Sequence, residues 1–125
     1  MSRYLFICVE NSCRSQMAEA FARMAGAEAQ SAGSAASGVV NPKAIASMAE
    51  VGYDLAAHKS ETVDALPPGA FDVVVSMGCG DACPTVPAKR RIEWDIPDPK
   101  QMDPQAFAAV RDRIRAEVEA LLAAA

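Results

Sequence analysis

The chain has 125 residues, of which 51% are apolar, and a formal net charge of −4. This length favours one domain over residues 1–125 with one hydrophobic core, and the acidic balance argues against a nucleic-acid surface, which needs a basic stripe. No apolar run approaches the roughly 18 residues of a membrane span, and the first residues lack the pattern of a signal peptide. We therefore expect a cytoplasmic protein that binds neither membrane nor nucleic acid and that works as a monomer.

Apolar strand-like segments alternate with amphipathic helical segments along the chain. Strands are expected at residues 4–9, 27–32, 71–77 and 91–94, and helices at residues 15–24, 42–51, 60–66 and 102–124. This alternation predicts an α/β fold with a parallel sheet, helices on both of its faces and right-handed crossovers. Ligands bind such sheets at the carboxyl ends of the strands, so the loops after the first, third and fourth strands form the candidate site.

The segment that follows the first strand, CVENSCRS at residues 8–15, has the composition of an oxyanion site. A short loop before a helix N-terminus points backbone N–H groups inward, and the helix dipole adds positive potential, so such a loop binds a tetrahedral anion. Arg14 can clamp two oxygens of that anion in a bidentate manner. The same field favours the thiolate of Cys8, which is the nucleophilic form.

Other residues complete this predicted substrate-binding loop. Ser15 can donate a hydrogen bond to the Cys8 thiolate, and Asn11 can hold the loop with its side chain while its backbone adopts a left-handed conformation. Cys13 is expected to pack behind the loop as a structural thiol. The alternative, a buried structural cysteine and an unrelated surface arginine, does not account for the strand before the loop and the helix after it. The remaining members of the loop are Val9, Glu10 and Ser12.

These residues resemble a known family. The run CVENSCRSQMAE at residues 8–19 resembles the phosphate-loop signature of low-molecular-weight tyrosine phosphatases, and more closely that of their arsenate-reductase relatives. The segments SAG at residues 31–33, NPKAI at 41–45 and DP at 98–99 match the same group. The resemblance implies a four-stranded parallel sheet and arsenate as the substrate that Cys8 attacks. Glu10 departs from the pattern, since Gly is usual there, and a carboxylate beside an anion should weaken binding unless it points outward.

A second pair of thiols, Cys79 and Cys83, follows the strand expected at residues 71–77. Four cysteines in a cytoplasmic chain favour catalysis, redox work or metal binding over permanent disulfides. Zinc competes as an explanation, but the cysteine spacings do not match the usual zinc pairs, and a thiolate in an anion loop is poorly placed as a ligand. Two unrelated buried cysteines are the simpler alternative. The resemblance implies a redox pair, because thioredoxin-coupled arsenate reductases carry two cysteines after the corresponding strand, with a proline after the second.

The loop after the last strand, WDIPDP at residues 94–99, holds a candidate general acid. A carboxylic acid there could protonate the departing oxygen, a contribution of about 10²–10⁴-fold. Asp98 matches the general acid of the resembled family, with Asp95 as the rival, although Asp before Pro is also common in turns. Phosphatases of that family often carry aromatic residues after this position. Lys100 and Gln101 follow here, which argues against phosphotyrosine as the substrate.

The sequence indicates no bound cofactor. Some of the resembled reductases hold a potassium ion near the anion-binding loop, and no other metal is expected. His58, the only histidine, is expected at the surface or in a helix cap rather than in catalysis. The only basic run, KRR at residues 89–91, is expected to be a solvated strand edge or turn. The positions that match the potassium ligands are Asn11, Glu19, Ser31 and Glu61.

The resemblance implies a mechanism with three cysteines. Cys8 attacks arsenate, Cys79 attacks the Cys8 adduct, and Cys83 then takes over the disulfide, which reduced thioredoxin regenerates. Three alternatives stay open. The chain could be a low-molecular-weight tyrosine phosphatase with redox-protective cysteines, a reductase served by a small thiol such as mycothiol or glutathione, or a non-catalytic anion sensor with an inert Cys8.

Overall fold

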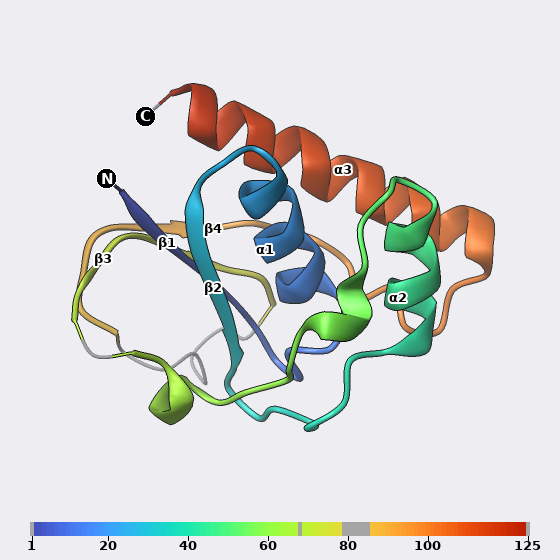
Figure 1. Cartoon of the computed structure of the whole chain (residues 1–125), viewed down its shortest axis with the longest axis horizontal. Coiled ribbons are helices and arrows are strands. Elements are labelled where there is room, and N and C mark those ends of the chain that lie inside the picture. Colours follow the sequence, from blue (N-terminus) through green and yellow to red (C-terminus); the bar gives the residue numbers. More distant parts are fainter. Residues whose placement is uncertain (1, 68, 79–85, 125) are drawn as a thin grey trace.

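The computed structural model describes residues 2–67, 69–78 and 86–124, and its elements follow the expected alternation (Figure 1). In the described part of the chain, no helix combines the length and apolarity that a membrane crossing requires. The strands are β1 (Arg3–Cys8), β2 (Glu28–Gly33), β3 (Phe71–Ser76) and β4 (Ala88–Glu93). The α-helices are α1 (Arg14–Met24), α2 (Pro42–Ala49) and α3 (Pro104–Ala123), and the 3₁₀ helices are η1 (Leu55–Ala57) and η2 (Val63–Ala65).

The four strands form one parallel sheet in the order β2-β1-β3-β4. Cys8 at the end of β1 pairs with Gly33 at the end of β2. Ser76 at the end of β3 pairs with Ile7 of β1 and with Glu93 of β4. The carboxyl ends of all four strands therefore meet at one edge of the sheet, and this edge is where the alternation of elements predicted the site.

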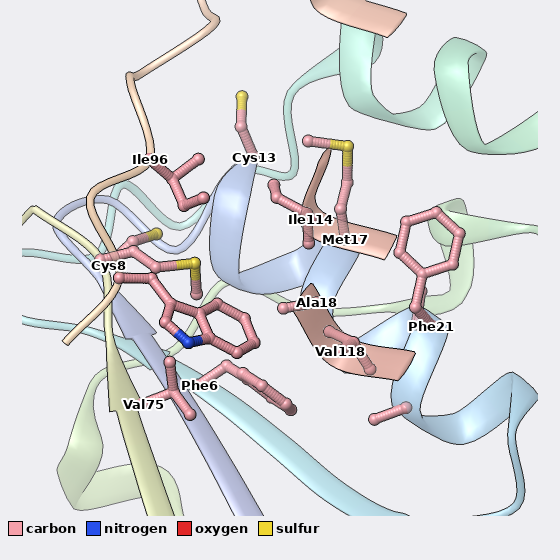
Figure 2. Packing of buried hydrophobic residues seen from close by; sticks show 14 of the residues in the cluster. Phe6, Cys8, Cys13, Met17, Ala18, Phe21, Val75, Ile96, Ile114 and Val118 are labelled. Atoms are coloured by element: carbon pink, nitrogen blue, oxygen red, sulfur yellow. The ribbon is translucent and has the colours of Figure 1, made fainter. Parts of the chain in front are cut away.

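Side chains that alternate along the strands build a core on each face of the sheet. On one face, Phe6 and Val75 pack with residues of α1 and α3 (Figure 2), and α2 contributes to the same core. Helix α3 runs over both α1 and α2 (Figure 1). On the other face, Leu5 and Ile7 form a smaller core against which Val63 of η2 packs. The prediction of helices on both faces is confirmed. Within the described residues, three α-helices cover one face of the sheet and the short η2 covers the other.

Helix α1 begins differently from α2 and α3. Asn41 caps α2 by accepting a hydrogen bond from the Lys43 N–H at 2.8 Å, and Asp103 caps α3 by accepting one from the Ala106 N–H at 2.8 Å. Pro follows each of these caps, as its fixed φ favours. Cys13 stands at the same position of α1, where no described side chain caps the helix. The first N–H groups of α1 are therefore available to an anion.

Two elements differ from the expected ones. The helix expected at residues 60–66 is reduced to η2, because Leu66 precedes Pro67 and has the extended backbone (ψ 150°) that proline imposes on its predecessor. The strand expected at residues 91–94 begins earlier, at Ala88, since pairing with β3 extends it. Its basic run is exposed because β4 is an edge strand, which confirms the expectation of a solvated strand edge.

Candidate active site

Two loops at the carboxyl edge of the sheet make up the candidate site. Residues 8–15, here called the anion loop, join β1 to α1, and residues 95–100, here called the acid loop, follow β4. Side chains of both loops line one small pocket. Its lining residues are Cys8, Glu10, Ser12, Cys13, Arg14 and Asp98. All but Asp98 belong to the anion loop, so the pocket is formed mainly by the segment that the sequence predicted to bind an anion.

Cys8, the nucleophile predicted from the sequence, lies at the start of this loop. Its Sγ lies 2.9 Å from the Oγ of Ser15, which is in the first turn of α1. Ser15 Oγ also accepts a hydrogen bond from Asn11 Nδ2 at 2.8 Å. A hydroxyl that already accepts one hydrogen bond keeps its hydrogen free to donate, so Ser15 can stabilise a Cys8 thiolate. The expected contact between Ser15 and Cys8 is present.

Asn11 holds the anion loop from behind, as expected from the sequence. It is fully buried and is the described non-glycine residue with a positive φ, 52°. Its Nδ2 donates to Ser31 Oγ at 3.0 Å as well as to Ser15. Its Oδ1 accepts from Gln16 Nε2 at 3.0 Å and from the Glu61 N–H at 2.8 Å. Four bonds to one amide tie the loop to β2 and to the segment before η2.

Two glycines let the loops approach their neighbours, and neither contact could be predicted from the sequence pattern. A Cβ on Gly33 would lie 2.7 Å from the carbonyl oxygen of Val9, so this glycine allows the anion loop to pack against the end of β2. A Cβ on Gly78 would overlap Arg14 Nη1, and Gly78 also has a positive φ of 82°. Glycine alone fits both conditions at Gly78 without strain.

Arg14 links the two loops. Its guanidinium is buried, with the residue 7% exposed, and Nη1 donates to the carbonyl oxygen of Ile96 at 3.0 Å. Its Nη2 lies 3.9 Å from Asp98 Oδ2. Asp98 lines the pocket, whereas the rival Asp95 is exposed and does not. The fold thus brings the predicted clamp, nucleophile and acid to one place, and of the two aspartates it brings Asp98.

Glu10, the residue that departs from the family pattern, is paired. Its Oε2 lies 2.6 Å from Lys100 Nζ of the acid loop. The Glu10 carboxylate raises the pKa of Lys100 by hydrogen bonding and by its charge. The carboxylate at the pocket rim is therefore compensated by an ammonium group that is 90 positions away in the sequence.

Cys13 differs from Cys8 although both are buried and neither is joined in a disulfide to another described residue. Burial raises the pKa of the Cys13 thiol to about 11. Its side chain points away from Cys8 (Figure 2). Cys13 is thus a neutral thiol at ordinary pH, in line with the expected structural role. The other predicted thiols, Cys79 and Cys83, lie outside the described residues.

A buried polar cluster lies behind the anion loop. Ser31 Oγ donates to Glu19 Oε1 at 2.5 Å, and Glu19, Ser31 and Glu61 line a common pocket. Burial raises the pKa of Glu19, and Arg23 Nη2 approaches its Oε2 at 2.8 Å. The positions matched to potassium ligands are therefore neighbours, with Asn11 bonded to Ser31. In the part of the chain that is described, no group of three or more His, Cys, Asp or Glu residues could hold a metal ion.

His58 lies at the C-cap of η1, one of the two positions expected from the sequence, and its side chain is buried rather than at the surface. Its side chain is 8% exposed. Nδ1 shares a hydrogen bond of 2.9 Å with Gln16 Oε1, and Nε2 shares one of 2.5 Å with the Tyr53 hydroxyl. Burial lowers the pKa of His58. The sequence held no sign of this role, because Gln16 is 42 positions away and is reached only when the loop after α2 packs against α1.

Comparison with known proteins identifies the family. The family model described as low molecular weight phosphotyrosine protein phosphatase matches residues 3–125. The chain belongs to this family. Within it, the chain is 38% identical to the glutaredoxin arsenate reductase of Synechocystis sp., over 98% of each protein. The resemblance stated from the anion loop and the later motifs is thereby confirmed.

Solved structures of this family share the fold. The chain is similar to an arsenate reductase in the phosphate binding state, with a TM-score of 0.86, 36% identity and 98% of both chains covered. It is also similar to a thioredoxin-dependent arsenate reductase of Corynebacterium glutamicum, with a TM-score of 0.74 and 28% identity. That match covers the whole of this chain and 64% of the other.

Proposed function

We propose that this family member reduces arsenate to arsenite, with Cys8 as the nucleophile. One observation carries the proposal: Cys8 Sγ lies 2.9 Å from a serine hydroxyl at the uncapped start of α1, in a pocket that Arg14 also lines. Such an arrangement supports a cysteine nucleophile that attacks a tetrahedral oxyanion held at the helix start. Relatives named arsenate reductase over nearly the whole chain support arsenate as that oxyanion.

The first step forms a covalent adduct. Arsenate binds to the N–H groups of the anion loop and to Arg14, and the Cys8 thiolate attacks arsenic. A bond forms between sulfur and arsenic, and an arsenic–oxygen bond breaks. Asp98 supplies the proton that lets this oxygen leave as water. Its Oδ2, which lies 3.9 Å from Arg14 Nη2, is the oxygen that faces the bound anion.

The second and third steps transfer two electrons. The Cys79 thiolate attacks the Cys8 sulfur, and the sulfur–arsenic bond breaks with its electron pair left on arsenic, so arsenic(V) becomes arsenic(III) and arsenite departs. The Cys8–Cys79 disulfide is then attacked by the Cys83 thiolate, which frees Cys8 and leaves a Cys79–Cys83 disulfide. We base these roles on the family resemblance and on the position of the two cysteines after β3.

The electron donor is proposed to be reduced thioredoxin, in a cytoplasm that keeps the other thiols reduced. A relative named for thioredoxin dependence supports this choice. Another relative is named a glutaredoxin arsenate reductase, which favours a glutathione-linked donor as the second candidate. The two electron donors differ in whether they require Cys83. Glutathione, as a small thiol, can attack the Cys79 sulfur directly and would make Cys83 dispensable. Full activity of Cys83→Ser with glutathione and glutaredoxin would favour the second candidate.

Phosphate-monoester hydrolysis is the alternative activity, and the family model supports it. It needs Cys8, Arg14 and Asp98 but neither Cys79 nor Cys83. The residues after Asp98 and Pro99 are Lys100 and Gln101 rather than the aromatic residues that would hold a phenyl ring, so we propose arsenate over phosphotyrosine.

The decisive experiment is arsenate reduction coupled to thioredoxin, thioredoxin reductase and NADPH. We expect turnover by the wild type and none by Cys8→Ser, Cys79→Ser or Cys83→Ser. One equivalent of arsenite should still form in a single turnover of Cys83→Ser. Unchanged activity of Cys8→Ser would refute the mechanism, and brisk phosphatase turnover without arsenate reduction would establish the alternative.

A potassium ion is a further part of the proposal. The oxygen atoms of Asn11, Glu19, Ser31 and Glu61 would hold it, and the buried Glu19 carboxyl beside Glu61 fits a cation there. The ion would supply charge that stiffens the back of the anion loop. We expect a higher melting temperature in potassium chloride than in choline chloride of equal concentration, and a smaller difference for Glu19→Gln. Equal melting in the two salts would contradict the site.

A further inference from the structure

One ion pair joins the two loops of the site. Glu10 projects from the anion loop and Lys100 from the acid loop, and their charged atoms are 2.6 Å apart. Both side chains are partly exposed, so this contact is at the rim of the pocket rather than in the core. Glu10 is also held through its backbone, because its carbonyl oxygen accepts from Ser60 Oγ at 3.0 Å and from the Ser37 N–H at 3.0 Å. The carboxylate therefore extends from a fixed backbone.

Lys100 is hydrogen-bonded to the candidate acid Asp98 as well as to Glu10. Its backbone N–H donates to Asp98 Oδ1 at 3.1 Å, which leaves Oδ2 as the oxygen nearest Arg14. Its carbonyl oxygen accepts from Lys43 Nζ of α2 at 2.9 Å. A displacement of Lys100 would consequently move the carboxyl group of Asp98.

We propose that Glu10 and Lys100 are positioning residues of this site: their ion pair holds the Asp98 carboxyl beside the anion loop, and Lys100 cancels the negative charge that Glu10 would present to an incoming oxyanion. This inference rests on the role of Asp98 in the proposed function. It explains why a carboxylate is tolerated where the family pattern has glycine. The carboxylate contributes to catalysis through the lysine that it holds.

The two halves of this proposal predict unequal effects for the two partners. Lys100→Met breaks the ion pair and also leaves the Glu10 charge uncompensated at the pocket rim, so kcat should fall about fivefold and KM for arsenate should rise about threefold to fivefold, the size expected for one partly exposed charge. Glu10→Gln removes the tie and the repulsive charge together, so kcat should fall about fivefold with little change in KM. The double variant should resemble Glu10→Gln and bind arsenate better than Lys100→Met alone.

The experiment measures kcat and KM for arsenate over a pH range in these three variants and in Asp98→Asn. If the pair acts through the acid, Glu10→Gln should lower kcat in the wild-type background and have no effect on kcat in the Asp98→Asn background. Lys100→Met should raise KM in both backgrounds. Lys89→Met is the matched control, because Lys89 forms a 3.3 Å pair with Asp72 at the opposite end of the strands and should leave both constants unchanged.

A second readout separates this inference from the proposed function. Inorganic phosphate binding can be followed by the fluorescence of Trp94, the only tryptophan, which directly precedes the acid loop. Phosphate affinity should fall in Lys100→Met and recover in the double variant. If the wild type does not reduce arsenate, the kcat comparison is repeated on p-nitrophenyl phosphate. A kcat effect of Glu10→Gln that persists without Asp98, or a double variant as weak in phosphate binding as Lys100→Met, overturns the proposal. If the wild type neither reduces arsenate nor hydrolyses p-nitrophenyl phosphate, the proposal that the pair positions Asp98 is overturned. The phosphate affinities then decide whether Lys100 cancels the charge of Glu10.

Discussion

The anion loop and the acid loop meet at one pocket but are held in different ways. The anion loop is fixed by buried hydrogen bonds, four of them to the amide of Asn11. Among the described residues, no buried side-chain nitrogen or oxygen lacks a partner. The acid loop is held by the buried Arg14 and by the buried side chain of Ile96, and at its rim by the exposed Lys43 and the partly exposed Lys100.

This difference fits the roles that we propose for the two loops. An oxyanion site gains most when its donors are fixed before the substrate arrives, because no reorganisation is then needed during the reaction. A proton donor must instead follow an oxygen that moves as it leaves, and a loop held at its rim can adjust. We expect changes in the anion loop to affect binding and stability strongly, and changes in the acid loop to affect mainly kcat.

The largest effect is expected for Arg14→Ala. Removal of the guanidinium takes away two donors to the anion and the tie to Ile96, so kcat/KM for arsenate should fall about 10²–10³-fold. Arg14→Lys keeps the charge but loses the planar fork and should recover only part of the loss. Steady-state kinetics with circular dichroism as a folding check would test this. An Arg14→Ala enzyme within tenfold of the wild type would contradict the clamp.

Asp98→Asn should come next. The amide cannot donate the proton, so kcat should fall about 10²-fold while KM stays near the wild-type value. Steady-state kinetics with arsenate would show this split between kcat and KM. Asp95→Asn is the matched control, because this exposed aspartate does not line the pocket. A larger loss in Asp95→Asn than in Asp98→Asn would reverse the assignment.

Asn11→Ala tests how firmly the anion loop is held. The change leaves buried donors and acceptors around it without partners, and it puts alanine at a positive φ, so the free energy of unfolding should fall by about 2–4 kcal/mol. Lys43→Met, which removes an exposed tie of the acid loop, should lower it by less than about 1 kcal/mol. Urea unfolding of both variants gives the comparison. Equal losses would show that the two loops are held alike.

The smallest effect concerns Cys13. Burial raises the pKa of the Cys13 thiol from its ordinary 9.0 to about 11, so the native state keeps the proton at a pH where the unfolded state loses it. The contribution of this thiol to stability is therefore complete below pH 9 and is lost as pH rises toward 11. The stability difference between wild type and Cys13→Ala should narrow between about pH 8 and about pH 10.5 in reducing buffer. A difference that widens would contradict the buried neutral thiol.

Local sequence was enough to predict the anion loop and the element order. The strand before Cys8, the helix after Arg14 and the turn-forming Asn11 lie within a dozen consecutive residues, and backbone geometry at a helix start follows from such short-range order. The alternation of apolar segments likewise predicted the parallel sheet, because each segment carries the period of its own element. The helix predicted at residues 60–66 was too long, because the proline after Leu66 outweighed the helical pattern and only η2 forms there.

Contacts between distant segments were decided only by the tertiary structure. Glu10 and Lys100 are 90 positions apart, His58 and Gln16 are 42 apart, and neither pairing follows from a periodicity. The sequence alone predicted that Cys8 would be a nucleophile beside Arg14, because both belong to one loop. It left the Glu10 carboxylate unexplained, because the charge that compensates it comes from a loop that only the folding of the sheet brings near.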